Sequence, residues 1–185
     1  AAKGEVNAVR ALLDAGADVN AREAESETAL MYAAVEGHTD VILLLISRGA
    51  NLNDISVNNE TALGRVAMRG KTETVRALLD GGASVDRSTE GHGTPLMDAA
   101  SGGFTETVKL LLARGANVDT QNVNGDTALA YAATRGAPLE TIRALLSAGA
   151  NVKSQNKKGK SAVDLANEQG HIEIAKLLKQ GGHRE

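Results

Sequence analysis

The feature of this chain that most constrains its fold is an internal repeat. Glycine-alanine pairs return at intervals of 33 or 34 residues, beginning at Gly16, Gly49, Gly82, Gly115 and Gly149. Two more series keep the same interval: a Thr-Ala-Leu triplet or a variant of it from 28, 61, 94, 127 and 161, and a lone glycine at Gly37, Gly70, Gly103, Gly136 and Gly170. Three series with one period predict a tandem array that covers essentially all 185 residues.

Each repeat unit predicts two short helices and a loop. The Thr or Ser that opens each triplet is typical of a helix N-cap, and Pro95 follows one of them at the first helical position, where proline is tolerated. The glycine of each Gly-Ala pair is typical of a left-handed residue just past a helix end. The residues before the next triplet are rich in Asn, Asp, Ser and Gly, which indicates a projecting turn or hairpin. Helices this short are unstable alone, so we expect an all-α solenoid held together by stacking.

The period sets the expected boundaries within a single domain of residues 1–185. They are a partial N-terminal repeat at 1–19, internal repeats at 20–52, 53–85, 86–118 and 119–152, a C-terminal capping repeat at 153–182 and a tail at 183–185. The first unit lacks its start and its turn, because Ala1 and Ala2 align with the end of a first helix, so we expect a trimmed N-terminus or half a cap. In the last unit Asp164, Asn167 and Lys179 replace apolar or small residues, which suits a polar outer face. Pro138 follows an extra residue, and we expect a local kink there.

These motifs resemble the ankyrin repeat family over about residues 1–182. The family's pattern appears as Thr94-Pro95-Leu96-Met97-Asp98-Ala99-Ala100, as Gly37-His38 and as Gly16-Ala17-Asp18-Val19-Asn20. The resemblance implies an ankyrin-repeat solenoid of helix-turn-helix units with projecting β-turn or hairpin loops, acting in protein–protein interaction. The chain departs from the pattern in the column that holds a histidine in the family, which here contains Met31, Gly64, Met97, Ala130 and Asp164. We expect the turns to be held less firmly for this reason, and Gly64 to weaken its helix.

Composition excludes several classes of function. With 20 Lys and Arg against 23 Asp and Glu, the net charge is −3, which argues against a nucleic-acid-binding protein. Cysteine is absent, which excludes disulfides and thiolate metal sites and is consistent with a cytoplasmic protein. The longest aliphatic run, 41–46, is too short to cross a bilayer. We therefore expect a monomer that is not inserted in a membrane.

No pattern in the chain predicts catalysis. The sequence Gly159-Lys160-Ser161 looks like the end of a phosphate-binding loop, but position 154 is Ser where that motif needs Gly. The four histidines lack metal-ligand spacing, and the carboxylates at Glu23, Glu25 and Glu27 lie on one arm of a turn that offers no closed pocket. We expect no enzyme activity, no bound metal and no cofactor.

The candidate binding residues lie in columns, because residues one repeat apart line up when units stack. The resemblance implies that three such columns on the first helices face a concave groove that contacts partners. The first column contributes the candidates Tyr32, Arg65, Asp98 and Tyr131, the second contributes Met68, and the third contributes Arg69 and Arg135. Tyr and Arg are enriched at binding hot spots. The alternative is that the tyrosines merely pack over the alanine pairs of the next unit.

Two further surfaces are candidates. Ile55 and Val57 form an apolar loop tip that either contacts a partner or packs against a neighbouring loop. A lysine cluster near the C-terminus could meet an acidic peptide, a phosphate group or a membrane surface, or could simply be a solvated turn; it consists of Lys153, Lys157, Lys158 and Lys160. The sequence thus favours a module that binds a protein or peptide in its groove. A small-ligand or phosphate-group sensor and a structural or engineered scaffold stay open as alternatives.

Overall fold

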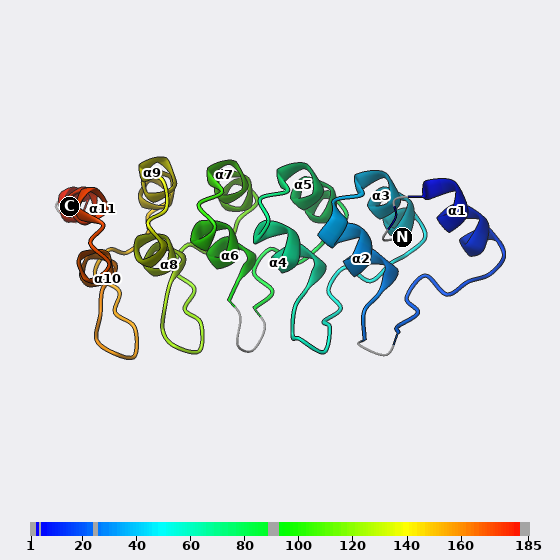
Figure 1. The fold of residues 1–185 in the computed structure, drawn as a ribbon, viewed down its shortest axis with the longest axis horizontal. Helices are drawn as coiled ribbons and strands as arrows, with labels where there is room; N and C mark the ends of the chain where they lie inside the picture. Colours follow the sequence, from blue (N-terminus) through cyan, green and yellow to red (C-terminus); the bar gives the residue numbers. More distant parts are fainter. Residues whose placement is uncertain (1–2, 4, 24–25, 89–92, 182–185) are drawn as a thin grey trace.

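The computed structural model describes residues 3, 5–23, 26–88 and 93–181, and these form eleven helices in two rows (Figure 1). The first helices of the repeats are α2 (Ala29–Glu36), α4 (Ala62–Ala67), α6 (Pro95–Ser101), α8 (Ala128–Arg135) and α10 (Ala162–Glu168). The other row contains α1 (Val6–Asp14), α3 (Thr39–Ser47), α5 (Thr72–Asp80), α7 (Thr105–Ala113), α9 (Leu139–Ser147) and α11 (Ile172–Gly181). The predicted all-α solenoid is confirmed. Glu25, His92 and His183 lie outside the described residues.

The helices begin and end at the residues that the repeat predicts. At the N-cap of each first helix, the Thr or Ser side chain accepts a hydrogen bond from the backbone N–H three residues on, as from Gly64 N to Thr61 Oγ1 at 3.0 Å. The second helices end in a left-handed glycine, for example Gly16 with φ of 90°. Just beyond it, the Ala17 N–H reaches back to the Leu12 carbonyl oxygen at 3.0 Å, which closes the helix end.

The core lies between the two rows of helices and runs the length of the array. Each first helix packs against its own second helix and against the first helix of the next repeat. Alanine pairs such as Ala33-Ala34 and Ala132-Ala133 are fully buried, which allows this close approach. The helix α1 has no first helix beside it in the described part of the chain, so Leu12 is 63% exposed whereas its equivalent, Leu45, is 1% exposed.

Side-chain hydrogen bonds join one repeat to the next. Along the second helices, threonine hydroxyls pair between Thr39 and Thr74 at 3.3 Å, Thr72 and Thr107 at 2.8 Å, and Thr105 and Thr141 at 2.7 Å. Successive loops are also joined, because an Asn or Asp before each of four first helices accepts from the backbone just beyond the second helix of the same repeat: Asn20 from Asn51, Asn53 from Ser84, Asp86 from Asn117 and Asp119 from Asn151. These bonds fix the stacking register that the columns require.

The lone glycine between the helices of a repeat receives a side chain of the following repeat. A Cβ built on Gly70 would lie 2.4 Å from the Phe104 ring, and one on Gly136 would lie 2.6 Å from His171. Pro138 lies in the same way on Gly103. The extra residue before Pro138 delays the start of α9 to Leu139, so the change is local, as predicted.

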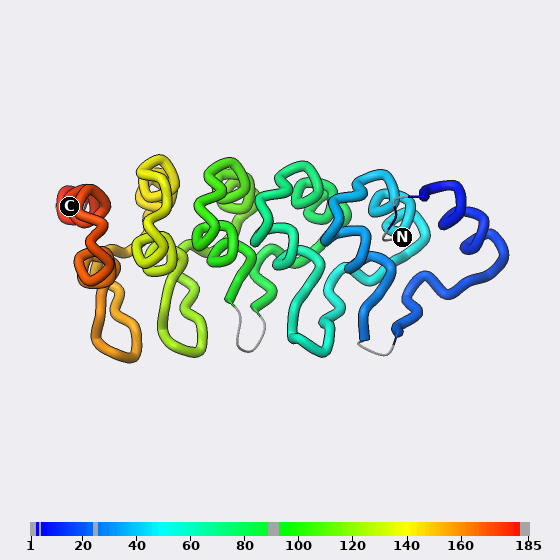
Figure 2. Tube along the Cα trace, viewed as in Figure 1, coloured from blue at the N-terminus to red at the C-terminus, as the bar shows by residue number. Residues whose placement is uncertain are grey.

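The loops project side by side from one edge of the array (Figure 2). In the loop between α7 and α8, the Asn122 N–H donates to Asp126 O at 3.0 Å and the Gly125 N–H donates to Asn122 O at 2.9 Å. The tip residue has positive φ in four loops, at Ser26, Asn59, Gly125 and Gly159. Isolated antiparallel bridges occur in two of them, at Arg22–Thr28 and Gln155–Ser161, which confirms their hairpin character. Within the described ranges, no helix has the length and apolar composition that a membrane span requires.

Candidate functional site

The candidate site is the surface formed by the first helices and the loops, which we call the groove. The predicted residues differ widely in accessibility along it. Met68 is 42% exposed and Val57 60% exposed, whereas Arg65 is 9% exposed. Exposed positions are Arg69, Arg135, Lys153, Lys157 and Lys158, and half-buried positions are Tyr32, Asp98, Tyr131, Ile55 and Lys160.

Arg65 is enclosed by acidic groups of its own and the preceding loop. Its guanidinium donates to both carboxylate oxygens of Glu27, with Nη1 2.8 Å from Oε2. It also donates to Glu60 Oε2 at 2.8 Å and to Ser56 Oγ at 3.2 Å. Burial lowers the pKa of Arg65, but the hydrogen bond to Glu27 and the charges of Glu27 and Glu60 outweigh this effect and raise it. The guanidinium is therefore occupied by contacts within the chain, and it ties the second repeat to the third.

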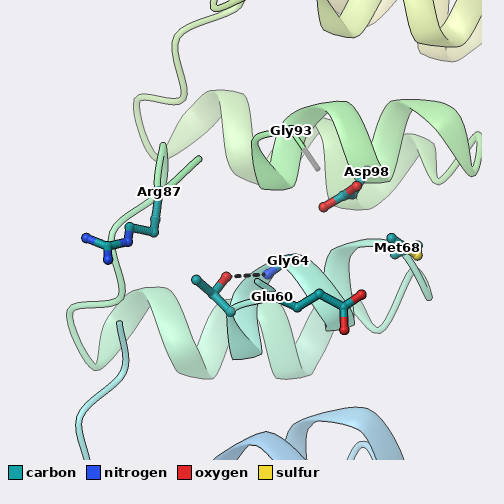
Figure 3. A pocket seen from close by; sticks show the side chains of 7 residues that line it. Glu60, Gly64, Met68, Arg87, Gly93 and Asp98 are labelled. Carbon is teal, nitrogen blue, oxygen red and sulfur yellow. Dashed lines mark hydrogen bonds between the residues drawn. The ribbon is translucent and has the colours of Figure 1, made fainter. Parts of the chain in front are cut away.

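A small hollow lies beside this cluster, between α4 and α6. Figure 3 shows the Asp98 carboxylate directed from α6 towards α4, with Met68 and Arg87 on opposite sides. The enclosed space is about 10 Å³, enough for roughly one water molecule. It exists because position 64 is glycine: a Cβ there would lie 3.3 Å from Asp98 Oδ2.

Asp98 has a strongly perturbed ionisation. Burial, together with the negative charge of Glu60, raises the pKa of this carboxyl from its ordinary value to about 7. Asp98 is therefore partly protonated near neutral pH and can act there as a hydrogen-bond donor as well as an acceptor.

The two tyrosines are held by the loops that precede their helices. The Tyr32 hydroxyl donates to Glu23, and the Tyr131 hydroxyl accepts from Asn122 Nδ2 at 2.9 Å. Burial and the charge of Asp126 raise the pKa of Tyr131. Both rings remain partly exposed on the groove, so they are fixed in orientation and still accessible to a partner.

The groove's C-terminal end contains a larger recess between the last two repeats, which we call the C-terminal hollow. Its volume is about 430 Å³. It brings together Tyr131 and Arg135 of α8 with three lysines of the neighbouring loop, Lys157, Lys158 and Lys160. The sequence had suggested two separate candidate surfaces here, the groove with Tyr131 and Arg135 and the lysine cluster near the C-terminus. The fourth lysine of that cluster, Lys153, does not line the hollow.

The relation to known proteins follows from this repeat geometry and from the sequence. A family model described as ankyrin repeats, in three copies, matches residues 1–56, 52–122 and 103–184. The chain belongs to the ankyrin repeat family. Ankyrin repeats are in general protein–protein interaction modules and are typically non-catalytic. A comparison with curated proteins finds no matching sequence.

Sequence reasoning missed two contributors to this ankyrin groove. Glu27 was grouped with Glu23 and Glu25 as acids on one arm of a turn that offers no closed pocket, yet its side chain is 4% exposed and faces Arg65. The sequence did contain a signal for this ion-pair cluster, because Glu27 and Glu60 are one repeat apart and Arg65 follows Glu60 by five residues. Asn122, which positions Tyr131, carried no comparable signal.

Proposed function

We propose that this ankyrin domain binds a partner protein through an extended segment or a helix that lies in the groove. The observation that carries the proposal is the combination of exposure and residue type on the first helices. Met68 and Arg69 in repeat 53–85, and Tyr131 and Arg135 in repeat 119–152, present accessible apolar, aromatic or guanidinium groups. Such groups are enriched among the residues that dominate binding energy.

Other predicted residues have supporting places in this proposal. Tyr32 and Asp98 offer partly exposed polar groups to the partner, and Val57 with Ile55 forms the rim at a loop tip. Arg65 acts indirectly, because its ion pairs hold the second and third repeats in the register that aligns the columns.

Capture of partners from an extract of the source cell tests the proposal. The groove variant combines Met68→Ala, Arg69→Ala and Tyr131→Ala, and circular dichroism verifies its fold. A matched variant truncates three exposed apolar residues on the opposite row of helices, namely Leu43, Leu139 and Ile172.

We expect proteins captured by the unmodified chain to be lost with the groove variant and retained with the matched one. Retention with the groove variant, or loss only with the matched variant, would place the binding surface elsewhere.

A further inference from the structure

The C-terminal hollow carries more positive charge than the chain itself neutralises. Four cationic and two anionic side chains line it: Arg135, Lys157, Lys158, Lys160, Asp126 and Glu168. Both carboxylates have partners within the chain. Glu168 pairs with Lys160 at 2.7 Å, and Asp126 accepts from Asn156 Nδ2 at 2.8 Å. Because the Asn156 amide is neutral, Asp126 keeps its charge, and four cations against two carboxylates leave a net charge of +2 in the lining. The cations of the lining that have no printed carboxylate partner among the described residues are Arg135, Lys157 and Lys158.

These three side chains differ from most arginines elsewhere in the array. Arg22 pairs with Asp54, Arg48 with Asp14 and Arg114 with Asp80, at 2.7 to 2.9 Å. Among the described residues, no ion pair or side-chain hydrogen bond involves the charged groups of Arg135, Lys157 or Lys158. An anionic group entering the hollow would relieve their mutual repulsion and would not have to displace an existing counter-ion.

The shape of the hollow favours a chain segment over a flat surface. Arg135 lies at the end of α8, whereas Lys157 and Lys158 lie in the loop that projects before α10 (Figure 1). A membrane would reach the projecting loops first, but a narrow segment can contact helix and loop together. The recess is within the size range of sites that take a few side chains.

The loop walls are held in place before any partner arrives. The Lys157 N–H donates to Asn124 O at 2.9 Å, and Gln121 Nε2 donates to Gln155 O at 3.2 Å. Gly125 allows this contact, because a Cβ at that position would lie 3.0 Å from Lys157 N. A site that is ordered in advance loses less conformational entropy on binding.

We propose that the C-terminal hollow binds the acidic part of an extended partner peptide, with Asp or Glu side chains between Arg135, Lys157 and Lys158. Tyr131, which also lines the hollow, contacts an apolar neighbour of those acidic residues. The net charge of −3 on the whole chain makes the binding of an acidic segment less favourable on average elsewhere on the surface than in this positively charged hollow. This inference rests on the proposed function, since it assumes that the groove is the binding face.

Selection from a random dodecapeptide library displayed on phage tests the inference. We expect the enriched peptides to be acidic, and a synthetic copy to bind less tightly as salt is raised. Fluorescence anisotropy then compares two triple variants of equal charge change. The hollow variant is Arg135→Gln, Lys157→Gln and Lys158→Gln, and the control, on the opposite row of helices, is Arg76→Gln, Arg143→Gln and Lys176→Gln. The hollow variant is expected to weaken binding about tenfold or more, and the control about twofold or less.

Other outcomes overturn the inference in distinguishable ways. Enrichment of neutral or basic peptides that no longer bind the Tyr131→Ala variant would refute the inference of an acidic partner, but it would support the proposal that partners bind in the groove. Peptides insensitive to both the hollow variant and Tyr131→Ala, or a library without any binder, would count against the groove as well. Equal weakening by the hollow and control variants would show non-specific attraction. Displacement of the peptide by millimolar inorganic phosphate, with a rise in melting temperature from phosphate alone, would indicate a small-anion site instead.

Discussion

Replacing Arg65 by alanine is expected to destabilise the protein strongly, because it leaves a buried carboxylate without its counter-ion. The Glu27 side chain is 4% exposed and receives two hydrogen bonds from Arg65. Removing one member of a buried ion pair costs about 3–5 kcal/mol. Glu60 is 23% exposed and can be hydrated, so the loss of its pair adds only about 0.5 kcal/mol. We therefore expect the free energy of unfolding to fall by about 4 kcal/mol.

Urea unfolding followed by far-ultraviolet circular dichroism near neutral pH measures this loss. Arg69→Ala is the matched control, since Arg69 is exposed and its side chain donates, among the described residues, only to the Arg65 carbonyl oxygen, at 3.1 Å. We expect it to change stability by about 0.5 kcal/mol or less. A double variant, Arg65→Met with Glu27→Gln, removes both charges and is expected to regain more than half of the loss. An Arg65→Ala protein as stable as the Arg69→Ala protein would refute the reasoning.

Three further predictions concern single positions. Because the pKa of Asp98 is raised to about 7 from 3.8, its ionisation favours unfolding as the pH rises through that range. Asp98→Asn should therefore stabilise the protein by about 2 kcal/mol near pH 8, a figure reduced because Asp98 is partly exposed. Below about pH 4, where the carboxyl is protonated in both states, the substitution should have no such effect. Thermal unfolding at both pH values checks this. Gly70→Ala should cost at least about 1 kcal/mol more than Gly49→Ala, because both glycines have positive φ but only Gly70 faces an aromatic ring; equal urea midpoints would contradict the ring contact. Ser26→Gly should stabilise by about 1 kcal/mol, since φ is 56° at this loop tip, and an unchanged or lower midpoint would argue against backbone strain there.

The repeat and its helix ends could be predicted because they depend on local chemistry. A Thr such as Thr61 caps a helix within three residues, and a glycine such as Gly16 closes one within a single turn. Stacking then follows from the period alone, so the columns of the groove were accessible to sequence reasoning. The local effect of Pro138 was predictable for the same reason.

Accessibility within the groove could not be predicted in the same way. Arg65 and Arg69 lie in two columns of the same groove, yet one is buried and the other exposed, because the loop of the preceding repeat places Glu27 over Arg65. The C-terminal hollow likewise depends on how far two loops lie apart, a distance that the spacing of residues in the chain does not contain. Asp98 was identified as a groove residue, but its raised pKa depends on burial and on Glu60.

The central claim, that partners bind in the groove, is tested most directly by hydrogen–deuterium exchange with and without a peptide selected on this protein. Exchange reports local opening of each backbone N–H group. The account predicts slower exchange in the first helices and loops, above all in α8, α10 and residues 120–126 and 153–160, with little change in α3, α5, α7 and α9. Slower exchange confined to those second helices would contradict it.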